Sequence, residues 1–159
     1  MERLIPCEAF QQASSLFECS AGDLVLTGVS GQMSYGIVGK RTEREANTIL
    51  MLPDGQQPTF VSGIEPIVTI KIECSWSFHV GNVASVSPSA PEGLGNLWFQ
   101  ENELWIKTAY LDDGWRDETF FGLKSATAYD RISSTICFRD WKLVASFENS
   151  DAAVVVESC

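Results

Sequence analysis

Residues Val68 to Val80 (VTIKIECSWSFHV) alternate strictly between apolar and polar side chains. This two-residue period predicts a β-strand with one dry face and one polar face. At about 3.3 Å per residue a straight strand of this length would span about 43 Å, which is too long for a compact domain of 159 residues. We therefore predict that the strand is bent or bulged, as at a barrel corner or where a strand passes between two sheets. Its dry face supplies the predicted core residues Ile70, Ile72, Cys74, Trp76 and Phe78.

The polar row of this strand ends at His79, the only histidine in the chain. Facing outward the row is an ordinary solvated surface, whereas facing inward it would line a polar cavity, and the outward orientation is favoured. Ser77 lies on the same face about 6.6 Å from His79 by the strand rise, but a working nucleophile and base need about 2.6–3.2 Å. We therefore predict no ready-made Ser–His dyad, and His79 is either a surface residue or a ligand contact. The row consists of Thr69, Lys71, Glu73, Ser75, Ser77 and His79.

Most other segments of the chain also have the composition of strands. They are short, rich in Val, Ile, Leu and Thr, and separated by Gly, Pro or Asp. An exception is the first segment, where Pro6 is followed by Ala9, Phe10, Ala13, Leu16 and Phe17 at helical spacing, which predicts a helix over roughly residues 6–19. Because strands and helices do not alternate, a doubly wound fold is excluded. The sequence predicts a mainly β fold, an antiparallel barrel or sandwich of about nine to eleven strands with one N-terminal helix.

Several turns and one loop organise this list of strands. Hairpins are predicted at Gly81-Asn82, with residues 83–87 as the return strand, at Glu101-Asn102 and at Arg139-Asp140, and a turn is predicted at Asp113-Gly114. The Pro/Gly/Ser-rich stretch 87–96 predicts a loop. We expect a single β-rich domain over residues 1–159, with this loop as a possible division into units 1–86 and 97–159.

The charge and the cysteines exclude several classes of function. A net charge of −10 argues against nucleic-acid and anionic-membrane partners, which need dense Lys/Arg surfaces. The five cysteines contain no CxxC pair, and one histidine cannot complete a Cys2His2 set, so no metal site and no cofactor are expected. Without a signal sequence or a long apolar run, a soluble protein in a reducing, cytoplasmic compartment is expected.

Two charged stretches receive ordinary interpretations. The acidic stretch LDDGWRDE (residues 111–118) matches no EF-hand spacing, although calcium or a glycosidase carboxylate pair stays open as an alternative. The basic stretch GKRTER, with Lys40, Arg41 and Arg44, lacks the glycine framework of a P-loop and is interpreted as a solvated turn, with a small-anion or acidic-partner contact as the alternative.

The hairpin around Glu101-Asn102 carries the most specific hint of function. With a two-residue turn, Trp98, Trp105 and Lys107 share one face of this hairpin. The indoles either pack beneath a neighbouring segment, which is the favoured interpretation, or form an exposed aromatic platform that binds a partner. The candidate binding residues are therefore Trp98, Trp105, Trp115, Lys107 and His79.

No constellation of residues has recognisable catalytic spacing, so the leading hypothesis is a non-enzymatic binding module for a protein or a small molecule. One alternative is a barrel-type enzyme or small-ligand carrier that uses His79, Ser77, Glu73 and Lys71. Further alternatives are an acidic inhibitor of a basic target, or an assembly subunit that forms oligomers through edge strands such as residues 152–158.

Overall fold

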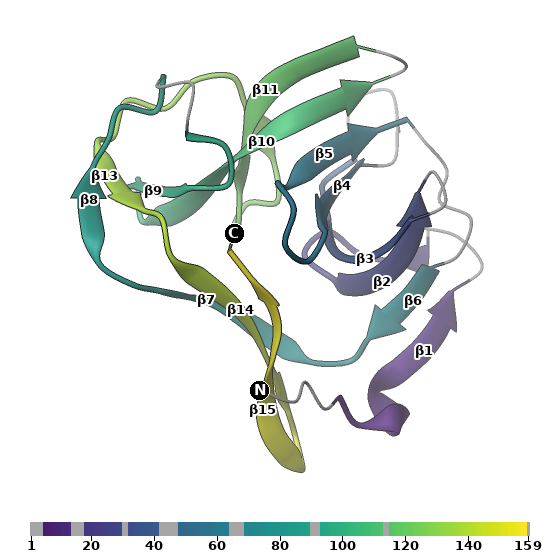
Figure 1. Cartoon of the computed structure of the whole chain (residues 1–159). Helices are drawn as coiled ribbons and strands as arrows, with labels where there is room; N and C mark the ends of the chain where they lie inside the picture. Colours follow the sequence, from purple (N-terminus) through teal and green to yellow (C-terminus); the bar gives the residue numbers. More distant parts are fainter. Residues whose placement is uncertain are drawn as a thin grey trace.

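The computed structural model describes residues 5–13, 18–29, 32–41, 48–63, 69–89, 93–112 and 115–158 (Figure 1). These residues form fifteen strands in two open sheets, with no α-helix among them. The larger sheet contains β1 (Phe10–Ala13), β2 (Leu24–Val29), β3 (Gln32–Val38), β4 (Thr48–Leu52), β5 (Thr59–Ser62), β6 (Thr69–Ile72), β8 (Val83–Ser85), β9 (Leu97–Gln100), β10 (Glu103–Asp112), β11 (Trp115–Gly122), β12 (Ala128–Tyr129) and β13 (Ile136–Phe138). The smaller sheet contains β7 (Ser75–Val80), β14 (Trp141–Phe147) and β15 (Ser150–Glu157). The predicted mainly β class is confirmed, although the strands exceed the nine to eleven expected. The additional strands include β1, in the segment predicted as a helix, and β6 and β7, which replace one predicted strand.

The larger sheet has the order β1-β6-β2-β3-β4-β5-β10-β9-β13-β8, and β11 and β12 branch from β10. Figure 1 shows the run from β1 to β10 following a curve. All pairs are antiparallel except β5 and β10, which run parallel from Thr59↔Ala109 to Ser62↔Asp112. The larger sheet is therefore mixed, and the predicted antiparallel arrangement is wrong for this pair. Both sides of the 87–96 loop therefore contribute strands to this sheet, and the possible division of the chain at that loop stays a prediction.

The predicted N-terminal helix is wrong over residues 7–13. A single 3-10 turn (η1, Cys7–Ala9) leads directly into β1, which pairs antiparallel with β6 from Phe10↔Ile72 to Ala13↔Thr69. The helical spacing of apolar residues was real, but local preference is weak, and pairing with a distant strand overrides it. Residues 14–17, which belong to the same prediction, lie outside the described residues.

The alternating segment is two strands, as its length required. β6 belongs to the larger sheet and β7 to the smaller one, and the change occurs at Glu73 and Cys74. Ile72 is fully buried, whereas Cys74, Trp76 and Phe78 are partly buried against the same core. Of the two alternatives that the sequence left open, a barrel corner or a passage between two sheets, the structure shows the passage.

The two neighbouring hairpin predictions are wrong for a related reason. β8 pairs with β13 rather than with β7, and β14 pairs with β7 and β15 rather than with β13. Arg139-Asp140, like Glu73-Cys74, is a point where the chain crosses from one sheet to the other. Gly81 donates its N–H to the carbonyl of Asp140 at 2.8 Å. The connection that follows β7 and the connection that precedes β14 therefore lie side by side.

The smaller sheet packs one face against the larger sheet. Leu143, Ala145 and Val155 from the smaller sheet share one buried cluster with Leu24 and Ile106 from the larger one. Two indole N–H groups tie the layers together, because Trp76 donates to the carbonyl of Gly22 and Trp141 to that of Gly95, both at 2.7 Å. β15 is an edge strand, as predicted for residues 152–158.

Strand β4 of the larger sheet is covered on both faces. Every residue of β4 is buried. Leu50 and Leu52 join the core between the sheets, whereas Ile49 and Met51 belong to a second buried cluster on the opposite face. A continuous apolar run such as TILML is typical of a strand covered on both sides.

Candidate functional site

Trp98 and Trp105 are cross-strand partners, as the two-residue turn predicted. The turn residues Glu101 and Asn102 have φ of 53° and 61°, which is the geometry of a type I′ hairpin, and Trp98 lies opposite Trp105. The indoles are 0% and 4% exposed, and their N–H groups donate to the carbonyls of Val86 and Gln100. The indoles therefore pack beneath neighbouring segments, which is the interpretation favoured from the sequence, and do not form an exposed platform; the assignment of these residues as binding residues stays a prediction.

Lys107 on the same face is also buried, which sequence reasoning did not anticipate. Its ammonium donates to the carbonyl of Pro88 at 2.8 Å and lies 3.3 Å from a carboxylate oxygen of Glu118. The side chain is 3% exposed. A lysine at such a position is tolerated because it is hydrogen-bonded and paired.

His79 lies far from this hairpin in the strand order, on β7 at the edge of the smaller sheet. His79, Ser77 and Ser75 are all exposed, so the polar row faces outward there, as favoured from the sequence, and the role of His79 as a ligand contact stays a prediction. The predicted separation of Ser77 and His79 is also wrong, because Nε2 of His79 lies 3.2 Å from Oγ of Ser77. The strand rise measures backbone spacing, whereas side chains lean along a strand and close the gap.

The other half of the polar row lies in a different environment. Thr69 is buried, with its hydroxyl 3.4 Å from that of Thr27. Lys71 lies 3.5 Å from carboxylate oxygens of both Asp23 and Glu73. The charge of Asp23 raises the pKa of Lys71. The row that the sequence presents as one surface is thus divided by the crossing between sheets.

The acidic stretch 111–118 spans a hairpin. β10 and β11 pair from Trp105↔Gly122 to Asp112↔Trp115. Asp113-Gly114, where the sequence predicts a turn, lies outside the described residues. The side chain of Trp115 lies outside what the structure describes, so its predicted role stays a prediction. Among the described residues no group of His, Cys, Asp and Glu side chains is arranged to hold a metal ion.

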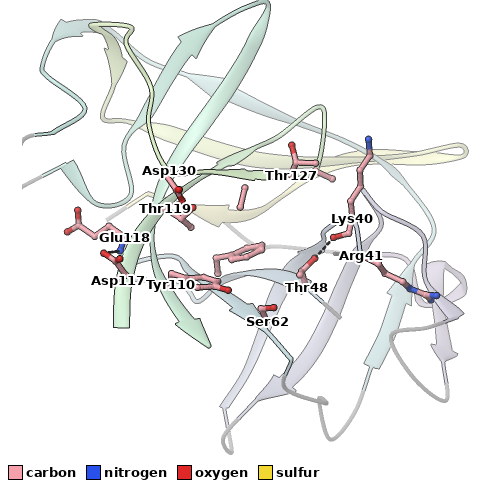
Figure 2. Close-up of a pocket in the computed structure, with 13 residues that line it drawn as sticks. Lys40, Arg41, Thr48, Ser62, Tyr110, Asp117, Glu118, Thr119, Thr127 and Asp130 are labelled. Carbon is pink, nitrogen blue, oxygen red and sulfur yellow. Dashed lines mark hydrogen bonds between the residues drawn. The ribbon is translucent and has the colours of Figure 1, made fainter. Parts of the chain in front are cut away.

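A cleft of about 450 Å³ opens where several strands of the larger sheet end (Figure 2). Lys40 and Arg41 follow β3, Thr48 begins β4 and Ser62 ends β5. Backbone bonds fix this rim, because Gly39 donates to the carbonyl of Thr48 and Lys40 to that of Ala126, at 3.0 and 2.8 Å. Thr48 also donates its hydroxyl to the carbonyl of Lys40 at 2.8 Å, the bond dashed in Figure 2.

The cleft carries opposite charges on its two sides. Figure 2 shows Lys40 and Arg41 on one side and Asp117, Glu118 and Asp130 on the other. Asp117 and Glu118 belong to β11, and Asp130 directly follows β12. These two strands branch from β10 in the larger sheet. The basic and acidic stretches that the sequence presents as separate solvated turns are therefore brought to one cleft; Arg44 lies outside the described residues.

Aromatic rings and hydroxyl groups line the cleft between these charges. Phe60 stacks on Tyr110, with ring centroids 5.5 Å apart and planes at 22°, and its other neighbour is Phe121 at 5.6 Å. The backbone N–H of Phe60 donates to the hydroxyl of Thr108 at 2.9 Å, which fixes β5 against β10. Sequence reasoning missed Phe60, Tyr110 and Asp130 as site residues, since no local pattern links segments that meet only through the parallel β5–β10 pair.

A second cavity, of about 420 Å³, lies on the opposite face of β11. Lys107 and Phe120, which are cross-strand partners, line it together with Pro88 and Ile132. Asp117, Glu118 and Asp130 line both cavities.

The described cysteines are free thiols away from the cleft lining. Burial raises the pKa of Cys74 to about 11, and it also raises the pKa values of Cys19 and Cys137. A raised pKa keeps a thiol protonated and unreactive at neutral pH.

No family model, curated protein or solved structure matches the chain. Within the described residues no helix is long and apolar enough to cross a membrane.

Proposed function

We propose that this chain is a non-enzymatic binding module and that its ligand occupies the cleft between the basic and acidic rims. The observation that carries the proposal is the placement of opposite charges across an aromatic floor in one cavity of about 450 Å³. That volume lies within the range of small-molecule sites, which combine an apolar lining with a few placed polar groups. In this proposal the curved run from β6 to β10 works as an incomplete barrel with the cleft at its mouth.

The charges of the rims indicate the chemistry of the ligand. An anionic group of the ligand would pair with Lys40, and a cationic group would pair with Asp117 and Asp130. The part of the ligand between these two groups would contact Tyr110. A dipolar ligand, with separate positive and negative groups, satisfies both rims at once. A small ligand of one charge that reached both rims would bring a like charge close to one of them, which opposes binding.

The lining of the cleft favours binding over catalysis. Its described residues include lysine, arginine, carboxylates, threonines and a tyrosine, but no histidine or cysteine. The one close Ser–His contact, between Ser77 and His79, is exposed on β7 and does not line this cleft. The barrel-type enzyme is therefore the weaker proposal.

A thermal-shift screen tests the proposal directly, because a ligand that binds only the native state raises the melting temperature. The panel consists of zwitterions (amino acids, dipeptides and betaines), with simple carboxylates and simple amines as single-charge controls. We expect zwitterions to stabilise the protein and the single-charge compounds to have smaller effects.

Charge reversal then locates the binding. Lys40→Glu is expected to reduce the affinity for a stabilising zwitterion at least tenfold. Lys142→Glu makes the same change of charge on exposed Lys142 of β14, away from the cleft lining, and is expected to leave the affinity unchanged. Equal effects of the two variants, or the absence of any stabilising zwitterion, would contradict the proposal.

A further inference from the structure

β11 is paired along its full length on one edge only. β10 covers that edge from Trp115 to Gly122. On the other edge β12 pairs with Phe120 and Phe121, and no other strand among the described residues continues the pairing over residues 115–119. Five residues of sheet edge, about 17 Å at about 3.4 Å per residue, are thus left without a neighbouring strand in the described part of the chain.

The backbone groups on this edge point outward. Gly122 donates its N–H to the carbonyl of Thr127 at 2.8 Å, on the side of β12. Because N–H groups alternate in direction along a strand, those of Phe120 and Glu118 point the same way. The N–H of Glu118 is bonded to Oδ1 of its neighbour Asp117 at 2.8 Å, so a side chain occupies the place that a carbonyl of a paired strand would take.

The two cavities lie on opposite faces of this same edge. Asp117 and Thr119 line the first cavity and have Tyr110 and Thr108 as their cross-strand partners on that face. Phe120 lines the second cavity on the other face. Side chains of an extended segment alternate between faces, so a strand added here would place successive side chains in the two cavities in turn.

We propose that the edge of β11 binds an extended, cationic peptide segment of a partner protein as an added antiparallel strand, with alternate side chains in the two cavities. Antiparallel pairing continues the direction of β12. The cationic character follows from Asp117, Glu118 and Asp130, which line both cavities beside this edge, and from the net charge of −10. The basic residues of the linings are Lys40 and Arg41 on the far rim of the first cavity, Lys107, which is paired with Glu118, and Arg131. Strand addition draws affinity from main-chain hydrogen bonds and specificity from the pockets for alternate side chains.

Binding exchanges one hydrogen bond for another. A peptide carbonyl accepts from the N–H of Glu118 and displaces Oδ1 of Asp117. The released carboxylate then pairs with a cationic side chain of the peptide. The inference rests on the proposed function, because the peptide occupies the acidic side of the same cleft. A segment that lies along the edge of β11 keeps its cationic side chains on that side, away from Lys40 on the opposite rim.

Fluorescence anisotropy with labelled seven-residue peptides tests this inference. The probe alternates lysine and valine and has blocked ends, and its counterpart has glutamate in place of each lysine. A third peptide keeps the lysines and valines but has three consecutive central amides replaced by esters, which removes N–H donors without changing the side chains. We expect the lysine peptide to bind at least tenfold more tightly than either of the other two.

A matched pair of variants tests the edge itself. Glu118→Pro and Glu118→Ala both remove the carboxylate that pairs with Lys107, but only the proline removes the outward N–H. Proline is tolerated on a strand edge whose N–H does not pair, and folding is verified by circular dichroism. Glu118→Pro is expected to bind the lysine peptide at least fivefold more weakly than Glu118→Ala.

The outcomes separate the two proposals. If zwitterions bind in a manner that depends on Lys40 but the lysine peptide does not bind, or binds no better than its glutamate or ester counterparts, strand addition is overturned and binding in the cleft stands. Equal peptide affinity of folded Glu118→Pro and Glu118→Ala also overturns strand addition. If Glu118→Pro fails to fold, the ester peptide decides the question alone.

Discussion

Replacing Trp98 with alanine should remove a large share of the protein's stability. The indole is 0% exposed, packs edge-on against Phe120 with centroids 5.8 Å apart, and donates to the carbonyl of Val86 at 3.0 Å. Truncating a buried tryptophan costs about 3–5 kcal/mol, and the lost hydrogen bond adds about 1 kcal/mol. We therefore expect Trp98→Ala to lower the free energy of unfolding by about 4–6 kcal/mol. The whole free energy of unfolding of a typical domain is about 5–15 kcal/mol.

Urea unfolding followed by far-UV circular dichroism measures this loss. Phe99→Ala is the matched control, because Phe99 is the next residue on the same strand, points to the other face and is 42% exposed. It should cost less than about 1 kcal/mol. Trp98→Phe keeps most of the apolar volume and loses the N–H donor, so an intermediate cost of about 1–3 kcal/mol is expected.

The comparison also decides between the two interpretations of the tryptophan pair. If Trp98→Ala cost no more than Phe99→Ala, the burial of the indole would be refuted and an exposed aromatic platform would return. A loss several times larger than that of the control shows that the pair stabilises the fold.

Three further perturbations test the energetics of the same region and of the core. Lys107→Met leaves a buried loop carbonyl without its donor and should destabilise the protein by about 1–3 kcal/mol in urea unfolding, whereas no loss would show that the ammonium contributes nothing. Gly122→Ala would place a methyl group 2.8 Å from the ring of Trp105, so the melting temperature should fall by several degrees, and an unchanged value would contradict the close approach. Because burial raises the pKa of Cys74 to about 11 from its ordinary 9.0, the folded state holds this proton more tightly, and its contribution to stability is lost as pH rises from about 9 to about 11. The difference in stability between wild type and Cys74→Ala should therefore shrink over that range, and a difference independent of pH would contradict the shift.

The predictions were most accurate where the structure of a segment is decided by that segment alone. The thirteen alternating residues are too long for one straight strand, and the described ones, from Thr69 on, form β6 and β7 on either side of Glu73 and Cys74. Likewise the turn residues Glu101-Asn102 determine both the turn type and the pairing of Trp98 with Trp105 on one face of the hairpin. In both cases the physical cause, strand length or turn geometry, is local.

Predictions failed where a distant segment decides the structure. Phe10 and Ala13 occur at helical spacing, yet pairing with Ile72 and Thr69 makes this segment a strand. The turn signals at Gly81-Asn82 and Arg139-Asp140 are genuine, but strands that flank a turn need not pair with each other when each has another partner.

The candidate cleft could not be predicted from the sequence for the same reason. Lys40, Phe60, Tyr110 and Asp130 lie on separate segments of the chain and meet only through the topology of the larger sheet. The sequence shows the acidic and basic stretches, but their positions on opposite sides of one cavity depend on the β5–β10 pair and on the branch to β11.

The crossing between sheets has a consequence for how the chain acquires its fold. β7 ends at Val80, but its sheet partner β14 begins only at Trp141, about sixty residues later in synthesis. During that interval Trp76 and Phe78 have no sheet neighbour, so a nascent chain exposes an aromatic strand that is prone to intermolecular pairing. Since the pairings of β1 with β6 and of β5 with β10 also join distant segments, slow folding, on the scale of milliseconds to seconds, is expected.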